Sequence, residues 1–245
     1  MKKYLEYIET AKGIIEKIST EGAPSIEKAA EVFADTLING KKVFLFGTGH
    51  SHMLSEELFY RAGGLVNIQP ILVEPLMLHI SASESTNAER VEGYAEKIFA
   101  DYGMAEGDTV VIISNSGRNG VAIDLALIAK ERGITTVVIT NMEHTMQGKS
   151  RHSSGKKLYE LGTIVIDNCG CIGDASMHIP EIGRNVAPTS TSAGAAILNA
   201  IEARAVEIMV ENGYTPDVFS SSNVDGGDEI NNAYIEKYKK EIKSL

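Results

Sequence analysis

The sequence contains no tryptophan and only two cysteines among its 245 residues, Cys169 and Cys171. Two cysteines separated by one residue cannot form a disulfide framework, so we expect the protein in the reducing cytoplasm. No apolar run approaches the roughly 20 residues that a membrane helix requires. The first residues, Met1-Lys2-Lys3-Tyr4-Leu5-Glu6, meet an acid before an apolar segment builds up, unlike a signal peptide. We therefore expect no membrane partner.

Basic residues are also scarce. The chain has 23 Lys and Arg against 33 Asp and Glu, a formal net charge of -10 and a pI of about 5.1. A nucleic-acid backbone requires clustered Lys and Arg, so we expect no nucleic-acid partner. An acidic chain can still hold a phosphate, because backbone N–H groups and helix N-termini bind anions locally.

Two loops that carry serines each follow a strongly apolar run. Residues 43–46 lead into Gly47-Thr48-Gly49-His50-Ser51, and residues 110–113 lead into Ser114-Asn115-Ser116-Gly117-Arg118-Asn119-Gly120. A helical pattern follows each loop. Such a passage from strand to helix directs free N–H groups, small hydroxyls and the positive end of a helix at one point. The two loops therefore predict a site for a phosphorylated ligand.

Apolar runs and helical periodicity alternate through the middle of the chain. This alternation is typical of a parallel sheet covered by helices on both faces. Strands are expected at 42–46, 68–74, 108–114, 135–140 and 163–167, and helices at 52–62, 88–102, 120–132 and 192–211. We therefore expect an α/β fold of three layers, with a five-stranded parallel sheet between helices, over residues 41–212. Ligands of such sheets bind at the carboxyl ends of the strands, where both serine loops fall.

Three segments lie outside this alternation. Residues 1–40 carry two amphipathic helices that we expect to pack on the domain or at a dimer interface. Residues 141–160 are polar and are expected to form a mobile surface segment, either a long loop or a short helix. Residues 213–245 form a tail with a polar loop and a charged helix. Our hypothesis is that this tail folds over the ligand site of its own or a neighbouring subunit.

Other kinds of site fail on spacing. The dinucleotide fingerprint needs a third glycine where His52 stands, and a hydrolase elbow needs Gly-x-Ser-x-Gly around Ser51. His50 and His52, or Cys169 and Cys171, could bind zinc, but Cys-x-Cys lacks the usual two-residue gap. We therefore expect neither a metal nor a cofactor.

Three motifs together resemble those of the sugar isomerase (SIS) domain family. They are the strand followed by residues 47–51, the strand followed by residues 114–119, and Glu181-Ile182-Gly183 with Thr189-Ser190-Thr191 at the start of a long helix. The chain resembles most the phosphoheptose-isomerase-like branch, in which a stretch like residues 223–229 also occurs. The resemblance covers residues 24–212. It implies a flavodoxin-like five-stranded parallel sheet, a homodimer or homotetramer with sites at subunit interfaces, and a phosphosugar ligand.

The resemblance also implies roles for particular residues. The second serine loop grips the phosphate, the first lines the sugar, and the start of the long helix completes the site. The implied binding residues are Ser114, Asn115, Ser116, Gly117 and Asn119, then Thr48, Gly49 and Ser51, and finally Thr189, Ser190 and Thr191. Asn119 stands where many members have Thr, and its side chain can still cap a helix and hydrogen bond.

Interconversion of an aldose and a ketose needs a base and a group that opens the sugar ring. The resemblance makes Glu181 the first choice for the base, although the chain inserts residues 184–185 and a proline after it. The phosphoheptose branch instead uses a Glu at the position of Arg61. His50 is the first choice for ring opening, with His52 and His178 as alternatives. The structural interpretations are that Glu181 starts a helix after Pro180, that His50 only orients its loop, and that His52 and His178 are surface or interface residues.

Three functions in different classes fit these residues. The first is an aldose–ketose phosphosugar isomerase that works by enediol proton transfer. The second is a phosphosugar-binding or regulatory protein without catalysis, which the departures at Glu181 and Arg61 favour. The third is a lyase that cleaves a sugar-acid ether, an activity that the resemblance allows. A DNA-binding regulator conflicts with the charge and with the absence of a convincing helix-turn-helix pattern.

Overall fold

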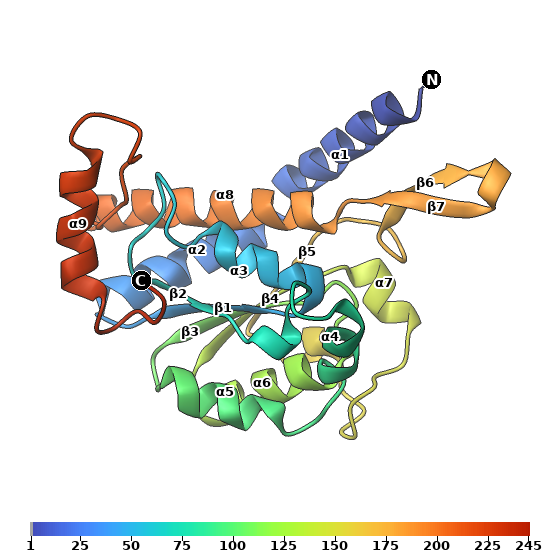
Figure 1. The fold of residues 1–245 in the computed structure, drawn as a ribbon, viewed down its shortest axis with the longest axis horizontal. Coiled ribbons are helices and arrows are strands. Elements are labelled where there is room, and N and C mark those ends of the chain that lie inside the picture. Colours follow the sequence, from blue (N-terminus) through green and yellow to red (C-terminus); the bar gives the residue numbers. More distant parts are fainter. Residues whose placement is uncertain (1) are drawn as a thin grey trace.

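Five apolar runs form one parallel sheet in the computed structural model, which describes residues 2–245 (Figure 1). Its strands are β1 (Val43–Gly47), β2 (Ile68–Ile71), β3 (Thr109–Ile113), β4 (Thr135–Thr140) and β5 (Ile164–Asp167). The strand order is β2-β1-β3-β4-β5, the flavodoxin-like order, in which the chain reverses direction across the sheet between β1 and β3. Val43 pairs with Ile68 on one side and with Thr109 on the other, so both serine loops leave the sheet at the same edge. The expected fold class is confirmed.

Helices cover both faces of the sheet because its side chains alternate between two apolar cores. Leu45 and Val111 point into one core, and Phe44 and Val110 point into the other. On the first face lie α1 (Lys3–Thr20), α2 (Ala23–Ile38), α3 (Met53–Glu57) and α8 (Ser190–Glu211), and on the second lie α5 (Tyr94–Tyr102) and α6 (Gly120–Glu131). The three-layer arrangement is visible in Figure 1. Within residues 2–245, no helix is both long and apolar enough to cross a membrane.

The helix expected at 88–102 begins only at Tyr94, because residues 89–93 form a turn. The chain forms α4 (Ala82–Ala88), turns, and restarts as α5 (Tyr94–Tyr102). Gly93 precedes α5 with a φ of 82°, a left-handed conformation that favours glycine, and its N–H donates to Asp124 Oδ2 at 2.6 Å. The apolar stripe is continuous in sequence, but this turn breaks the backbone between the two helices. The break places Glu89 and Arg90 beside the second serine loop, since Val121 N–H donates to the Glu89 carbonyl.

The helix expected at 52–62 is also shorter in the structure than its sequence pattern predicts. A 3-10 turn (Gly49–His52) leads into α3, which ends at Glu57. The following coil pairs with the C-terminal tail instead: Gly63 N–H donates to the Phe219 carbonyl at 2.8 Å, and Leu65 bridges to Val218. These contacts from a distant part of the chain supply the backbone hydrogen bonds that a longer helix would have made internally.

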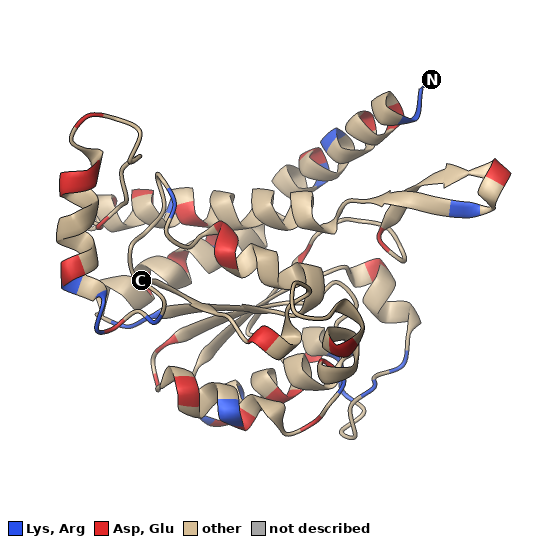
Figure 2. Ribbon diagram, viewed as in Figure 1, with Lys and Arg blue, Asp and Glu red and all other residues tan. Residues whose placement is uncertain are grey.

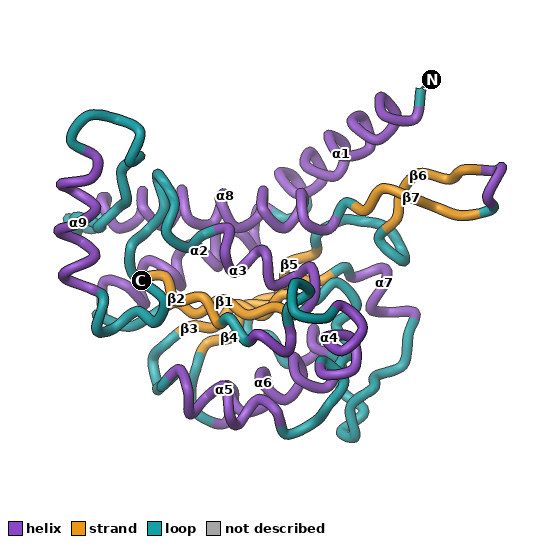
Figure 3. The backbone as a smooth tube through the Cα atoms, viewed as in Figure 1, coloured by secondary structure: helices purple, strands orange, loops and turns teal. Residues whose placement is uncertain are grey.

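A two-stranded antiparallel hairpin was missed by the sequence pattern. It consists of β6 (Ala175–Ile179), a 3-10 turn (Pro180–Ile182) and β7 (Arg184–Pro188). Figures 1 and 3 show it projecting from the body beside the N-terminal part of α1. Tyr7 Oη on α1 donates to the Pro188 carbonyl at 2.9 Å.

The polar segment 141–160 is anchored on the domain rather than free. It contains α7 (Met142–Gln147), a coil and a 3-10 turn (Leu158–Glu160). In the coil, His152 Nε2 lies 2.7 Å from Asp124 Oδ1, and Ser153 N–H and Oγ both donate to Glu92. The coil thereby runs close to α6 and to the turn before α5.

The C-terminal tail lies at the opposite end of the sheet from the serine loops (Figure 1). It forms α9 (Gly227–Tyr238) and then a coil that returns to the beginnings of β1 and β2. Lys42 Nζ donates to the Glu241 carbonyl at 3.1 Å, and Lys243 N–H donates to Gln69 Oε1 at 2.6 Å. The hypothesis that the tail covers the ligand site of its own subunit is therefore wrong, because these contacts hold it at the amino-terminal edge.

Candidate functional site

The first serine loop is a tight turn at the carboxyl end of β1. A Cβ on Gly47 would lie 2.4 Å from the Ser51 carbonyl oxygen, and Gly49 has a φ of 55°, so the turn requires glycine at both places. His52 is buried, and its Nδ1 lies 2.8 Å from the Gly49 carbonyl oxygen. This hydrogen bond gives His52 the role of orienting the loop, whereas the sequence suggested that role for His50 and a surface or interface position for His52. His50 is exposed beside it.

The second serine loop leaves several backbone donors free at the start of α6. Ser114 Oγ accepts from Gly117 N–H at 3.2 Å, which closes the turn, and Gly117 has a φ of 58°. Among residues 2–245, no hydrogen bond occupies the backbone N–H groups of Ser116, Arg118 and Asn119. Unpaired N–H groups at the amino end of a helix form a concave anion site. This geometry agrees with the phosphate-binding role that the resemblance implies.

Asparagine side chains connect the ends of β3, β4 and β5. Asn168 Nδ2 donates to Asn115 Oδ1 at 2.8 Å, and Asn141 Nδ2 donates to Asn168 Oδ1 at 3.0 Å. Asn141 Oδ1 in turn accepts from His144 N–H and caps α7. This relay fixes the orientation of the Asn115 amide at the sheet edge. Asn168 was missed because the only signal in the sequence is its position directly after β5, a strand with no serine loop.

A small polar cavity joins the first loop, the second loop and the start of α8. Its lining combines the predicted residues Ser51, Asn115, Ser190 and Thr191 with Asn168 and three apolar side chains, and contains no Lys or Arg. Its volume is about 10 Å³, room for about one water molecule.

A carboxylate of the chain already occupies the amino end of α8. Asp174 accepts from Thr189 N–H at 3.0 Å, from Ser190 N–H at 2.8 Å and from Ser190 Oγ at 2.6 Å. These hydrogen bonds tie the amino end of α8 to Asp174, which directly precedes the β6–β7 hairpin. Thr189 is fully buried, and its Oγ1 has no hydrogen-bond partner. Of the three residues assigned to this helix start, Ser190 and Thr191 line the cavity and Thr189 lies beneath it.

Glu89 is the carboxylate that contacts the first loop directly. Thr48 Oγ1 donates to Glu89 Oε2 at 2.6 Å, and Glu89 is half-buried. Sequence periodicity placed Glu89 within a single helix and gave no sign of this contact. The turn between α4 and α5 creates it.

Glu181 and His178 lie on the projecting hairpin, far from the serine loops in this chain (Figure 1). Glu181 is exposed in the turn Pro180–Ile182, and His178 Nδ1 lies 2.9 Å from Asn185 Oδ1. The predicted base therefore does not meet the loops within one subunit. Its catalytic role, like that of His50, stays a prediction.

Within residues 2–245, the structure brings together no group of three or more His, Cys, Asp or Glu side chains that could hold a metal ion. Cys169 and Cys171 are half-buried free thiols, and burial raises the pKa of both.

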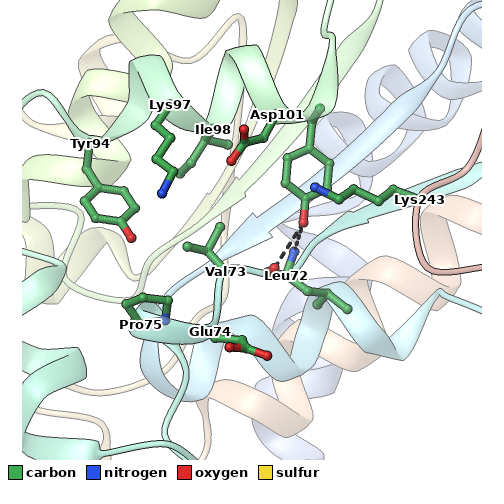
Figure 4. Close-up of a pocket in the computed structure, with 10 residues that line it drawn as sticks. Leu72, Val73, Glu74, Pro75, Tyr94, Lys97, Ile98, Asp101 and Lys243 are labelled. Carbon is green, nitrogen blue, oxygen red and sulfur yellow. Dashed lines mark hydrogen bonds between the residues drawn. The ribbon is translucent and has the colours of Figure 1, made fainter.

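A separate hollow of about 210 Å³ lies between α5, the end of β2 and the C-terminal coil (Figure 4). Lys97 and Asp101 come from α5 and Lys243 from the tail. Tyr102 Oη donates to the Leu72 carbonyl at 3.0 Å and accepts from Leu72 N–H at 2.8 Å. None of the predicted site residues lines this hollow.

Comparisons with known proteins agree with this fold. A UPF0309 protein from Geobacillus sp. (strain WCH70) is 45% identical over 98% of this chain and 97% of its own length. One from Thermoanaerobacter pseudethanolicus is 45% identical over 98% and 99%, respectively.

Among solved structures, phosphoheptose isomerases from Neisseria gonorrhoeae and Francisella tularensis match with TM-scores of 0.52 and 0.53. Their sequence identities are 18% and 17%, and each match covers 84% of this chain and 95% or 97% of the other. At this identity they show a shared fold. The SIS domain model matches residues 6–141, and this chain belongs to the SIS domain family.

Proposed function

We propose that the protein binds a sugar phosphate and interconverts its aldose and ketose forms in the cytoplasm. The observation that carries this proposal is the set of unpaired N–H groups at Ser116, Arg118 and Asn119, located beside a neutral cavity lined by hydroxyls and amides. The N–H groups suit a phosphate, and the cavity suits sugar hydroxyls. The likeness to phosphoheptose isomerases supports a ligand of this class.

Glu89 is the base that the geometry of one subunit favours. An enediol mechanism needs a carboxylate that removes the proton from C2 of the aldose and returns it to C1, while the hydroxyl proton on the C2 oxygen passes to the C1 oxygen. Glu89 is held at the first loop by Thr48, so it lies on the same edge as the proposed phosphate site. His50, exposed on the same loop, is the proposed group for ring opening.

For Glu181 we propose a catalytic role only as a residue that a second copy of the chain contributes to the site. The hairpin that carries it projects away from its own loops, and the proposed homodimer or homotetramer would bring it to a neighbouring subunit (Figure 1). In that arrangement a site would combine Glu89 from one chain with Glu181 from the other. Separate variants of the two carboxylates can distinguish their roles.

Proton exchange tests the proposed reaction. The protein is incubated in deuterated water with a panel of aldose and ketose phosphates, and deuterium at C1 and C2 is followed by NMR. We expect Glu89→Gln to lower the exchange rate by a factor of about 100 or more, since general base catalysis contributes about 10² to 10⁴-fold. The control Glu84→Gln changes an exposed carboxylate on neighbouring α4 and should leave the rate unchanged. Exchange at the wild-type rate in Glu89→Gln would exclude Glu89 as the base.

Binding without catalysis is the second candidate. Arg61 stands where the phosphoheptose branch carries its Glu, and it is paired with Glu57 on α3. A sugar phosphate that raises the melting temperature of the protein but exchanges no C1 or C2 proton would favour binding without catalysis. Loss of that stabilisation in the double variant Ser114→Ala/Ser116→Ala would still locate the phosphate at the second loop.

A further inference from the structure

Three arginines meet on the outer side of the second serine loop. Arg118 belongs to the loop, Arg90 follows α4, and Arg151 lies on the coil after α7. Arg151 N–H donates to the Arg118 carbonyl at 2.9 Å, and Arg151 Nη1 donates to Asn119 Oδ1 at 2.9 Å. A Cβ added to Gly120 would lie 2.8 Å from the Arg90 carbonyl oxygen, so the backbone of residue 90 touches the start of α6. Figure 2 shows basic segments along the coil after α7, on the side of α4 and α6.

These guanidinium groups have no carboxylate partner. Over residues 2–245, Arg61, Arg132 and Arg204 each form an ion pair within 4.0 Å, whereas Arg90, Arg118 and Arg151 form none. The Nε of Arg118 is buried without a hydrogen-bond partner. Burial lowers the pKa of Arg151, and the charges of Arg118 and Arg90 lower it further. Like charges held together in this way repel each other, and an anion between them would relieve the repulsion.

The coil that carries Arg151 is held firmly in place. His152, next in sequence, contacts Asp124 through Nε2, and Ser153 donates twice to Glu92. Asp124 and Glu92 thus hold the coil and form no ion pair with the arginines, while the charge of Glu89 offsets only part of the repulsion at Arg151. The backbone that carries Arg151 is therefore positioned before any ligand arrives.

We propose that Arg90, Arg118 and Arg151 bind the phosphate of the sugar phosphate together with the N–H groups of the second serine loop. The inference rests on the proposed function and deepens it. The cavity on the inner side of the loop has no basic residue and receives the sugar hydroxyls, while the dianionic phosphate monoester lies on the arginine side. Arginine suits this role because its planar fork of donors matches phosphate oxygens. Neutral sugars would lack the group that this cluster recognises.

Calorimetric titration with inorganic phosphate and with glucose 6-phosphate tests the cluster. We expect Arg118→Gln and Arg151→Gln each to weaken the binding of both probes by about 10-fold or more, since hydrogen bonds to charged groups contribute about 1.5–3 kcal/mol. Arg151→Lys should also weaken it, because a lysine cannot replace a fork of donors. The matched control Lys130→Gln removes one positive charge from an exposed position at the far end of α6 and should leave affinity unchanged.

Two other outcomes separate this inference from the proposed function. If the wild-type protein binds glucose 6-phosphate and the arginine variants bind it equally well, the cluster does not bind the phosphate. Only the second serine loop then remains as the proposed phosphate site. If neither probe binds the wild-type protein and no sugar phosphate of the exchange panel stabilises it, both proposals are overturned. The melting temperature of each variant is also measured. A value near that of the wild type would show that a variant that no longer binds is still folded.

Discussion

Glu202 on α8 is a buried carboxylate far from the proposed phosphate site. It is 5% exposed, and its Oε1 accepts from Leu65 N–H at 2.7 Å. Burial raises the pKa of Glu202 to about 7, although the hydrogen bond from Leu65 and the charge of Arg61 oppose this shift. The residue joins α8 to the coil that pairs with the C-terminal tail. Its ionisation therefore affects the stability of this end of the molecule.

The raised pKa predicts that stability falls as pH rises through this range. The folded protein holds the Glu202 proton up to about pH 7, whereas the unfolded chain releases it near its ordinary pKa of about 4.3. The folded state therefore binds more protons between these values, and ionisation above pH 7 costs on the order of 3 kcal/mol. Glu202→Gln keeps an acceptor for Leu65 and should raise stability at pH 8 but not at pH 4.5. Denaturant unfolding at the two pH values measures this difference.

An exposed acid on the same helix serves as the control. Glu207→Gln changes a residue whose side chain is 62% exposed and should give the same small effect at both pH values. If Glu202→Gln left the free energy of unfolding at pH 8 unchanged or lower, the carboxylate would not carry the expected penalty.

At the scale of elements, the contrast between two glycines tests why the helix predicted at 88–102 begins only at Tyr94. Gly93 has a φ of 82°, whereas Gly13 lies within α1, and a Cβ at either would meet no atom within 4 Å. Gly93→Ala should therefore cost about 1 kcal/mol or more from backbone strain alone. Gly13→Ala should instead gain about 0.5–1 kcal/mol, because alanine is the better helix former. Thermal unfolding of both variants measures the contrast, and equal effects would contradict this account.

The same elements show how far the sequence could predict the fold and the site. Short, mostly apolar runs predicted every strand of the main sheet, because burial on both faces leaves a local pattern. The β6–β7 hairpin was missed because β7 is mostly exposed, β6 is only partly buried, and neither carries apolar residues in clear alternation. Ser51 and Asn115 could be predicted to meet because each follows a strand at the same sheet edge, whereas Ser190 and Thr191 were assigned to the site only through the family resemblance. Glu89 and Arg151 lie near that edge because of turns and contacts between distant segments. Such contacts leave no periodic pattern in the sequence, so these two residues could not be predicted.

At the scale of the whole molecule, α1 and the hairpin form an apolar surface without a partner in this chain. Tyr4, Leu5, Ile8 and Ile15 are exposed on α1, as are Ile182 and Val186 on the hairpin. Apolar side chains gathered on a projecting arm are typical of an interface between subunits. The proposed homodimer or homotetramer would bury this surface and bring the hairpin to a second copy.

Light scattering coupled to size-exclusion chromatography tests this assembly. We expect a mass of two or four times the 26.4 kDa chain for the wild-type protein, and a shift toward the monomer in Ile8→Glu. The control Val224→Glu changes a 55% exposed residue on the tail, at the other end of the molecule, and should keep the wild-type mass. If a neighbouring hairpin supplies Glu181 to the site, the dissociated Ile8→Glu variant and Glu181→Gln should both lose proton exchange while still binding phosphate. A monomeric wild-type protein with full exchange activity would contradict the interface, and it would leave Glu89 as the carboxylate that each subunit must supply for itself.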